Sequence, residues 1–422
     1  MNRQFSAWLW RLNNPGVMAA YREIKANEHQ FEELAAHHFN RILRHAKDTV
    51  PFYRDIEVVG IKDIARLPIM TKEIIRSANG ALKSRNAQSY TYWENSSGGS
   101  TGEPVRLLQD AEYQRWVGAS MHYYFRDMLG CDWSKSRKMD IWGSVEDFEK
   151  NTRSLKSRLK NKLGNMAFVN AFRFGEAEMA DTVRKMNAFK PEILKGYANS
   201  IFDLACFVEK EGLSVHQPKL VNTRTAMVYP EQRAIIERAF GAPVYDFYGS
   251  RENSAIAGEV PGVDGRVIMA FNNIVEVVDG EILVTNLHNH IMPLIRYKIM
   301  DQADNITYSD NNLPVLHNLS GRVFDYFITS PDSRVHAQYV ITLFFYIDEI
   351  LSFQVLQKDY DLYTVKYVPR SGASVTLETM RAIESKMKKA LRDDIKVDWQ
   401  IVDEIEKTMS GKHQYVKCEI PS

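Results

Sequence analysis

The chain has 422 residues, of which 45% are hydrophobic and 25% charged, as expected for a globular protein rather than a disordered one. Its formal net charge of +1 argues against a nucleic-acid binder that depends on bulk positive charge. The cysteines (Cys131, Cys206 and Cys418) are far apart, which indicates neither a disulfide scaffold nor a zinc cluster. The length indicates either more than one domain or one large domain with a small appendage.

No stretch has the character of a targeting or membrane-spanning segment. The apolar patch at the N-terminus is too short for the core of a signal peptide, and the longest apolar run, residues 340–347, is too short to cross a bilayer. We therefore expect a cytoplasmic protein. Peripheral membrane contact through Phe5, Trp8 and Trp10 is an alternative.

The N-terminal third is predicted to be mainly helical at its beginning. Apolar residues recur at three- and four-residue steps between residues 14 and 46. Thr71 is expected to cap a following helix, and residues 112–128 are expected to form another. Residues 138–142 are expected to form a buried strand. The basic stretch 150–162 is either a solvated helix face or a docking surface for an anionic substrate.

Helices and strands alternate in the middle of the chain. Pro230 at the start and Gly241 just beyond the end mark one of these helices. Such alternation predicts an α/β sheet with parallel strands. The expected helices are 177–189, 202–211 and 230–240, and the expected strands are 193–197, 223–227 and 243–248.

Further along the chain the sequence pattern predicts antiparallel strands. Asp279-Gly280 lies between two apolar runs, 274–278 and 281–285, which is a strong signal for a two-residue hairpin. A domain boundary is expected near Gly321 to Asp325, which divides the chain into domains 1–325 and 326–422. The second domain is predicted to be α+β, with strands at 340–346, 352–357, 362–367 and 397–402 and a helix whose apolar face carries Leu377, Met380, Ile383, Met387 and Leu391.

A glycine- and hydroxyl-rich loop follows the β-rich run at residues 90–93. Glycines allow backbone N–H groups to converge, and hydroxyls add donors, so the loop suits the oxygens of a phosphate chain. No Gly-Lys-Ser/Thr follows at the spacing of a Walker loop. A flexible linker is the alternative. The residues of interest are Ser96, Ser97, Gly98, Gly99, Ser100, Thr101 and Gly102.

Two further stretches could bind a nucleotide. Tyr248-Gly249-Ser250-Arg251-Glu252 ends a predicted strand of the α/β sheet, where ligands bind in such folds. Tyr248 could stack on a base and Glu252 could hold Mg²⁺. Asp301, at the end of Arg296-Tyr297-Lys298-Ile299-Met300-Asp301, could accept hydrogen bonds from ribose hydroxyls. Read alone, each stretch is more often a surface turn or a strand-end salt bridge.

The last two stretches belong to the predicted boundary and the C-terminal tail. In Gly321-Arg322-Val323-Phe324-Asp325, Arg322 could contact ribose or phosphate, and Asp325 could absorb the backbone rotation of a hinge. Lys412 follows Ser410-Gly411 near the C-terminus. Ordinary turn chemistry and a solvated lysine are the alternatives.

The order and spacing of these stretches resemble the adenylate-forming ligase superfamily. The N-terminal Arg41-Ile42-Leu43-Arg44-His45-Ala46, the following Val50-Pro51-Phe52-Tyr53-Arg54 and the later Gly196-Tyr197-Ala198-Asn199-Ser200 are similar to motifs of its phenylacetate–CoA ligase branch, which includes enzymes of capsular polysaccharide biosynthesis. The resemblance covers almost the whole chain. It implies an α/β fold: a large N-terminal domain with mixed β-sheets flanked by helices, and a small mobile C-terminal α+β domain.

The resemblance also implies site residues. The loop Ser97 to Gly102 would close over the ATP phosphates, with Tyr248, Gly249 and Ser250 beside the nucleotide. Glu252 would bind Mg²⁺, Asp301 and Arg322 would hold the ribose, Asp325 would be the hinge, and Lys412 would reach the carboxylate and the α-phosphate. The catalytic set is thus Lys412, Glu252 and Arg322. Four residues suggest an apolar or aromatic pocket for the carboxylic acid, although such residues more often belong to the core: Trp142, Tyr197, Met227 and Tyr229.

The chain departs from the superfamily pattern at several positions. Glu103 stands where the phosphate loop usually has lysine, and the usual Thr-Gly before Asp301 is Ile299-Met300. Met227 stands where relatives often carry glutamate, and the tail around Lys412 lacks the usual Pro-Arg. These changes bear on nucleotide binding and on the second half-reaction.

The leading hypothesis is an ATP-dependent, AMP-forming carboxylate ligase that uses Mg²⁺ and releases pyrophosphate. Coenzyme A is the slightly favoured acceptor of the acyl group. An amine on a sugar or amino acid is the alternative acceptor. A third hypothesis is a degenerate member that binds nucleotide or acyl ligand without catalysis. We expect small-molecule partners and no nucleic acid, and relatives suggest a homodimer.

Overall fold

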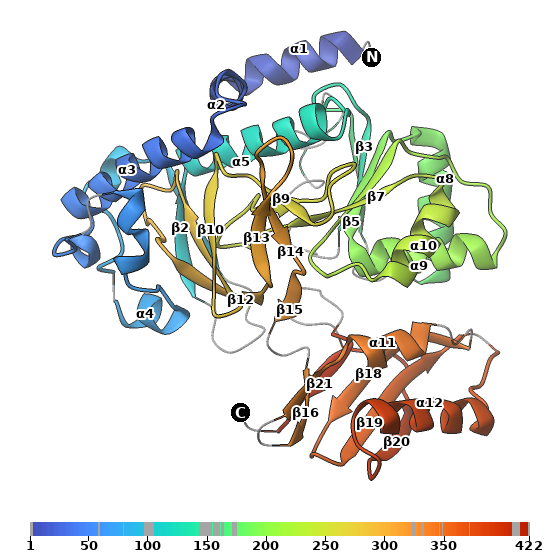
Figure 1. Cartoon of the computed structure of the whole chain (residues 1–422). Helices are drawn as coiled ribbons and strands as arrows, with labels where there is room; N and C mark the ends of the chain where they lie inside the picture. Colours follow the sequence, from blue (N-terminus) through green and yellow to red (C-terminus); the bar gives the residue numbers. More distant parts are fainter. Residues whose placement is uncertain are drawn as a thin grey trace. The chain divides into compact units, whose positions relative to one another are not determined.

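Figure 1 shows the computed structural model of the chain. The structure describes residues 3–57, 60–78, 80–96, 105–142, 154, 161, 164–170, 175–322, 326–330, 333–345, 347, 349–370, 372–406 and 414–420. The chain divides into two compact units, the first comprising Met1–Val228 and Ile235–Ser320, the second Tyr229–Ala234 and Gly321–Ser422. The main part of the second unit thus begins five residues before the predicted start at 326 (326 − 321 = 5).

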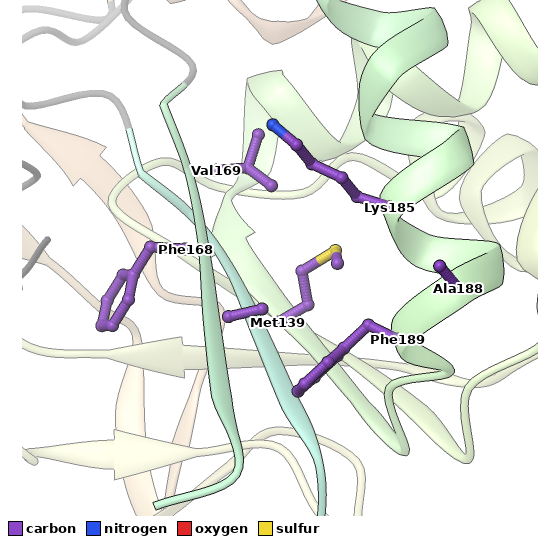
Figure 2. Close-up of a pocket in the computed structure, with 7 residues that line it drawn as sticks. Met139, Phe168, Val169, Lys185, Ala188 and Phe189 are labelled. Carbon is purple, nitrogen blue, oxygen red and sulfur yellow. The ribbon is translucent and has the colours of Figure 1, made fainter. Parts of the chain in front are cut away.

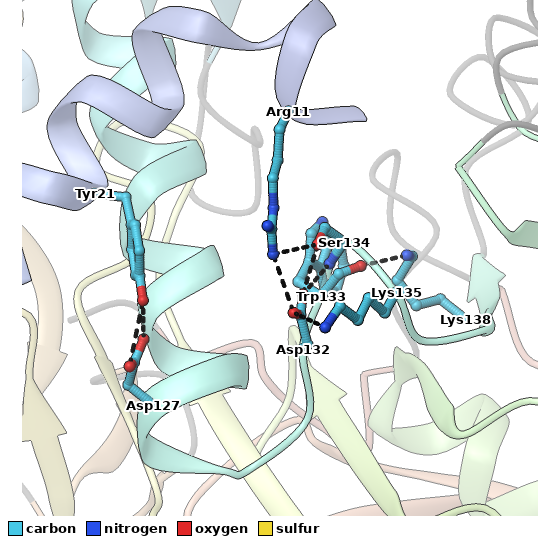
Figure 3. A network of polar contacts seen from close by, with 8 residues as sticks. All are labelled: Arg11, Tyr21, Asp127, Asp132, Trp133, Ser134, Lys135 and Lys138. Atoms are coloured by element: carbon cyan, nitrogen blue, oxygen red, sulfur yellow. Dashed lines mark hydrogen bonds and ion pairs between the residues drawn. The ribbon is translucent and has the colours of Figure 1, made fainter. Parts of the chain in front are cut away.

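The chain begins with helices α1 (Arg3–Asn13), α2 (Pro15–Ala26) and α3 (Phe31–Thr49). The helical pattern predicted for residues 14–46 is therefore two helices, because a turn after Ala26 interrupts it. Side-chain hydrogen bonds attach α1 and α2 to the segment 127–134 (Figure 3). Arg11 donates to Asp132 Oδ2 at 3.3 Å, and Tyr21 Oη donates to Asp127 Oδ2 at 2.9 Å.

Short elements follow: the 3-10 turns η1 (Pro51–Tyr53), η2 (Ile61–Arg66) and η3 (Ala87–Ser89), and helix α4 (Lys72–Ser77). The predicted cap of α4 is confirmed, because Thr71 Oγ1 accepts a hydrogen bond from the Ile74 N–H at 3.3 Å. Strands β1 (Tyr92–Ser96) and β2 (Arg106–Asp110) form an antiparallel pair. Helix α5 (Ala111–Tyr123) and a π-turn, η4 (Tyr124–Met128), together cover the predicted helix 112–128.

A nine-stranded mixed sheet organises the first unit, in the order β13-β14-β9-β8-β7-β6-β5-β3-β4. The strands from β7 to β4 run parallel, as predicted, and the others are antiparallel. Their bounds are β3 (Lys138–Trp142), β4 (Met166–Asn170), β5 (Ile193–Tyr197), β6 (Leu220–Arg224), β7 (Val244–Tyr248), β8 (Ala257–Gly258), β9 (Arg266–Ile268), β13 (Asn305–Tyr308) and β14 (Pro314–His317).

Helices α8 (Glu176–Phe189), α9 (Ala198–Lys210) and α10 (Pro230–Phe240) connect the parallel strands. The predicted strand 193–197 and helix 230–240 have the predicted bounds. The strand predicted at 223–227 instead ends at Arg224, because Thr225 has a left-handed backbone with φ of +74° that cannot continue an extended strand.

A second sheet of the first unit has the order β10-β11-β12-β15. The predicted hairpin is confirmed: β10 (Asn273–Val278) pairs antiparallel with β11 (Glu281–Asn286), with Val278 opposite Glu281. Strands β12 (Tyr297–Gln302) and β15 (Ser320–Arg322) complete this sheet. A parallel bridge between Met70 and Tyr297 attaches the segment before α4 to β12.

The second unit is α+β, as predicted. Its main sheet has the order β20-β19-β18-β21, and β16 and β17 form a separate antiparallel pair. The elements are β16 (Tyr326–Ser330), β17 (Ser333–His336), α11 (Gln338–Phe345), β18 (Ile350–Gln357), β19 (Leu362–Pro369), α12 (Leu377–Ala390), β20 (Lys396–Ile401) and β21 (Val416–Cys418).

Two expectations for this unit are wrong. The strand predicted at 340–346 is helix α11, because a short run of mainly apolar residues carries no period that separates helix from strand. Phe344 of this helix stacks on Phe353 of β18 at 4.6 Å, so tertiary packing decided the outcome. Leu377, predicted on the apolar face of α12, is 72% exposed, since the packed face begins later, at Met380.

No helix in the described part of the chain is long and apolar enough to cross a membrane.

Candidate functional site

The carboxyl ends of the parallel strands gather the residues of interest. Trp142, Tyr197, Arg224 and Tyr248 are the last residues of β3, β5, β6 and β7. From β3 the chain continues to β4, which pairs with one edge of β3. It then returns to β5, which pairs with the opposite edge of β3, and continues from there to β6. Ligands of open α/β sheets bind at the carboxyl ends where the strand order reverses in this way. The edge formed by β3 and β5 therefore has the expected position of a ligand site.

Gly196 brings β3 and β5 unusually close at this edge. A Cβ atom at this position would collide with the backbone carbonyl oxygen of Ile141. The glycine of the predicted Gly196-Tyr197 motif thus has a packing role. It sets the spacing between the strands that carry Trp142 and Tyr197.

Most of the predicted phosphate loop, Ser97, Gly98, Gly99, Ser100, Thr101 and Gly102, lies outside the described residues, as does Glu103. Ser96 is described as the last residue of β1, opposite Arg106. Below it, Asn95 Nδ2 donates to Gln109 Oε1 at 3.1 Å, and Gln109 Nε2 donates to the Arg251 carbonyl at 2.7 Å. The two strands that flank the loop are therefore attached to the turn that carries Glu252.

Tyr248 and Asp301, predicted on separate grounds to contact a nucleotide, lie side by side. Tyr248 Oη donates a hydrogen bond to Asp301 Oδ2 at 2.7 Å, which joins β7 of the large sheet to β12 of the second sheet. After Tyr248 the chain turns at Gly249. The turn is closed by hydrogen bonds from the Ser250 N–H to the Asn253 carbonyl at 2.8 Å and from the Asn253 N–H to Ser250 Oγ at 3.0 Å.

Glu252 lies in this turn, 8% exposed. Tyr297 Oη, from β12, donates to its Oε1 at 3.3 Å. The carboxylate is therefore held by the same strand that carries Asp301. We refer to Gln109, Tyr248, Glu252, Tyr297 and Asp301 as the strand-end network.

The backbone before Asp301 explains how the altered motif keeps this aspartate in place. Met300 has φ of +72°, in the left-handed region that glycine adopts most readily. The superfamily pattern has glycine at this position, so methionine adopts the same turn at a steric cost of roughly 1–2 kcal/mol. Arg296 of the same motif is buried and donates to Glu276 at 3.1 Å and to the Leu67 carbonyl at 2.7 Å, which makes it a structural anchor.

Three predicted functional residues cannot be compared with the structure. Asp325 and Lys412 lie outside the described residues. Arg322 is the last residue of β15, and its side chain is not among the described ones.

The four residues predicted to line the acid pocket belong to both units. The rings of Trp142 and Tyr197 are 4.8 Å apart at the ends of the neighbouring strands β3 and β5. Met227 is half-buried in the segment after β6. Tyr229 is buried, belongs to the second unit, and its N–H donates to Gln232 Oε1 at 3.1 Å.

Sequence inspection missed a set of buried charges beneath the strand ends. Lys195 of β5 forms an ion pair with Asp140 of β3, and both are at least 94% buried. Arg224 of β6 lies close enough to interact electrostatically with both. Burial lowers the pKa of Lys195 to about 8, an effect that Asp140 opposes and Arg224 reinforces. The sequence did contain a signal for this set, because Asp140 and Lys195 each lie within an apolar strand, where charged residues are rarely buried unless they are paired.

A separate apolar cavity of about 380 Å³ lies between β3, β4 and α8. Figure 2 shows Met139, Val169 and Phe189 around it, with Lys185 nearby. None of the predicted site residues lines it. Among the described residues, no group of three or more His, Cys, Asp or Glu side chains could hold a metal ion.

The comparisons with known proteins agree with this architecture. The family model of the CapK C-terminal domain matches residues 327–419. Over most of its length the chain is similar to Protein CapK of Staphylococcus aureus, with 22% identity over 420 aligned residues that cover 94% of this chain and 91% of that protein.

Among solved structures, 2-hydroxyisobutyryl-CoA ligase in its postadenylation state, in complex with 2-HIB-AMP, matches with a TM-score of 0.68 and 16% identity over 92% of this chain and 89% of its own. The anthranilate CoA ligase AuaEII, in complex with anthranoyl-AMP, matches with a TM-score of 0.54 and 13% identity over 76% of this chain and 65% of its own. The predicted resemblance to adenylate-forming ligases is thereby confirmed for the fold.

Proposed function

We propose that this protein activates a carboxylic acid with ATP, forms an acyl-adenylate with release of pyrophosphate, and transfers the acyl group to coenzyme A. The observation that carries the proposal is the hydrogen bond of 2.7 Å between Tyr248 and Asp301, because it unites two residues predicted from separate motifs to hold the adenosine. The shared fold and the CapK resemblance over 94% of the chain support it.

The strand-end network has the properties required of an adenosine site. A hydrogen bond from Tyr248 orients the Asp301 carboxylate, and carboxylate oxygens accept hydrogen bonds of the kind that ribose hydroxyls donate. Met300 accepts a strained backbone next to this carboxylate, as residues at functional sites often do. In this proposal Gly249, Ser250 and the side chain of Arg322 complete the nucleotide contacts, and the loop Ser97 to Gly102 covers the phosphates.

Glu252 fits a magnesium site of the kind that depends on substrate. Mg²⁺ is usually held by one or two carboxylates, with the remaining positions filled by water and phosphate oxygens. Glu252 supplies one carboxylate, oriented by Tyr297, on the turn attached to the base of the phosphate loop. A bound Mg²⁺ would supply charge stabilisation for the phosphate oxygens.

Lys412 supplies the positive charge that the chemistry requires. The carboxylate attacks the α-phosphorus, so two anions approach each other, and an ammonium group aimed at the oxygens of both lowers the barrier. We assign Lys412 to this role and Asp325 to the hinge about which the second unit moves between the two half-reactions.

Carboxylate-dependent exchange of labelled pyrophosphate into ATP tests the first half-reaction. A panel of aryl, fatty and amino acids would be assayed with the intact protein, Lys412→Ala and Asp301→Asn. Exchange with one acid class should fall by at least about 100-fold in both variants. Lys417→Ala, which removes an exposed lysine paired with Glu419, and Asp304→Asn are matched controls that should leave the rate unchanged.

The second half-reaction is tested by adding acceptors after an active acid is found. Release of AMP that requires coenzyme A, with formation of a thioester, supports the proposal. AMP release that requires an amine would identify an amide ligase in its place. No exchange with any acid, together with measurable ATP binding, would contradict catalysis and favour a non-catalytic binder.

A further inference from the structure

A row of side chains crosses the carboxyl ends of the parallel strands, one from each strand. It consists of Trp142 on β3, Tyr197 on β5, Arg224 on β6 and Phe247 on β7. Trp142 and Tyr197 are in contact, Tyr197 is in register with Arg224, and the Arg224 guanidinium lies over the Phe247 ring at 5.5 Å. Because parallel strands in register direct paired residues to the same face, these side chains share one face of the sheet. We call them the strand-end row.

Arg224 is the charged member of the row, and two described neighbours, Asn222 and Phe247, orient its guanidinium. Its Nε donates to Asn222 Oδ1 at 3.3 Å, and its flat face packs on Phe247. Among the described residues neither of its two terminal nitrogens has a hydrogen-bond partner, and Nη2 is buried. An oriented guanidinium with two free terminal nitrogens matches the geometry of a carboxylate.

Among the described residues, the charges beneath the row do not balance. The buried Lys195 and the half-buried Arg224 carry two positive charges, and the buried Asp140 carries one negative charge, so the three sum to +1. Lys138, buried on the same strand as Asp140, does not reduce this excess, and its pKa is lowered to about 7, chiefly by burial and then by Lys195. Two more distant carboxylates, Asp132 and Glu192, oppose that shift. A buried excess of positive charge is costly unless an anion accompanies it.

We infer that Arg224 binds a second carboxylate of the substrate, so that the acid activated by this protein is dicarboxylic, with an apolar or aromatic body lying against Trp142 and Tyr197. This inference rests on the proposed function. The carboxylate that is adenylated loses its negative charge during the reaction, so a permanently charged guanidinium bound to it would oppose that step. The second carboxylate keeps its charge throughout, which makes it the group suited to Arg224.

The experiment compares matched acids that differ only in the second carboxylate. Isophthalate is compared with benzoate, and glutarate with pentanoate, by pyrophosphate exchange and by calorimetric binding to the full chain without ATP. The variants are Arg224→Met and Arg224→Lys, with Arg184→Met, an exposed arginine of α8, as control. Circular dichroism checks that each variant is folded, and Arg224→Lys keeps the charge if Arg224→Met is unstable.

The expected result is that the intact protein prefers the diacid in at least one pair. Arg224→Met should lower kcat/KM for that diacid by roughly 100-fold or more, as for other sites built to bind a polar substrate group, and leave the monoacid within about threefold. Arg224→Lys should retain part of the preference. Arg184→Met should have no effect.

Two outcomes would overturn the inference: a preference for the monoacid, or equal loss of both acids in folded Arg224→Met. The two proposals fail separately. Diacid binding that depends on Arg224 without any exchange would support the anion site and contradict the ligase. Exchange with monoacids that is independent of Arg224 would support the ligase and contradict the anion site.

Discussion

In the strand-end network the hydroxyls of Tyr248 and Tyr297 each donate to a carboxylate, whereas polar atoms around Arg224 find no hydrogen-bond partner in the part of the chain that the structure describes. Asp140 Oδ1 and Arg224 Nη2 are both buried without a hydrogen bond to any described residue. The two regions adjoin at the large sheet, where Arg224 ends β6 and Tyr248 ends the neighbouring strand β7, although Tyr297 and Asp301 belong to β12 of the second sheet.

The difference indicates two kinds of polar site. A network whose groups satisfy one another holds its shape before a ligand arrives, and suits a constant partner such as adenosine. Buried groups that lack partners cost free energy in the empty protein, which a ligand of complementary charge would recover. The unsatisfied region is therefore where we expect specificity for the acid.

The largest effect is expected from breaking the buried ion pair of the unsatisfied region. Lys195→Met leaves the Asp140 carboxylate buried without its cation, which should destabilise the first unit by about 3–5 kcal/mol in urea unfolding followed by circular dichroism. The double variant Asp140→Asn/Lys195→Met should recover at least half of the loss. A loss of less than about 1 kcal/mol in the single variant would show that the buried Asp140 carboxylate does not depend on Lys195, which would contradict this prediction.

His38 is a buried histidine away from the strand ends. It tests whether a buried polar side chain without hydrogen-bond partners among the described residues is enough to change protein stability strongly. Burial lowers the pKa of His38 to about 3, whereas the unfolded chain takes up a proton near 6.5. The unfolded state thus binds more protons between these values, and stability should fall as pH drops below about 6.5. His38→Phe should reduce the loss between pH 7 and pH 5 by about 2 kcal/mol in thermal or urea unfolding.

His29→Gln, in the exposed turn before α3, is the control for removal of an imidazole. His38 Nε2 lies 3.1 Å from Glu23 Oε1 without hydrogen-bond alignment, so Glu23→Gln should change the pH dependence less than His38→Phe. If His38→Phe had the same pH dependence of stability as the intact protein, His38 would not be the group responsible for the loss of stability below about pH 6.5.

A smaller effect is expected in the satisfied network. Tyr248→Phe removes the donor to Asp301 and should cost about 1 kcal/mol of stability, the usual contribution of one hydrogen bond. Tyr297→Phe, whose bond to Glu252 is longer at 3.3 Å, should cost less. Urea unfolding of both variants would measure the two losses of stability. A larger loss in Tyr297→Phe would show that the hydrogen bond to Glu252 contributes more than the hydrogen bond to Asp301.

The smallest effect is expected at Met300. Met300→Gly relieves the left-handed backbone but adds freedom to the unfolded chain, so the free energy of unfolding should change by less than about 1 kcal/mol. Met300→Val, which is β-branched, should be clearly worse at the same position. Equal stability of the two variants would mean that the backbone at Met300 is not strained.

Local patterns predicted most of the fold. The strand 193–197, the helix 230–240 and the hairpin at Asp279-Gly280 follow from residues within each segment. Residues 340–346 were mistaken for a strand because their apolar character has no period, and only packing against β18 made them a helix. Part of the predicted site, including Lys412 and Asp325, falls outside the described residues and stays a prediction.

Sequence by itself determined most of the helices and strands and the motifs that suggest an adenylate-forming ligase, because backbone preference, turn chemistry and motif spacing are local properties. Only the tertiary structure decided that β3 lies next to β5, that Tyr248 meets Asp301, and that the terminal nitrogens of Arg224 have no hydrogen-bond partner among the described residues. The physical reason is that the satisfaction of a buried polar group depends on its neighbours in space, and strand order sets those neighbours.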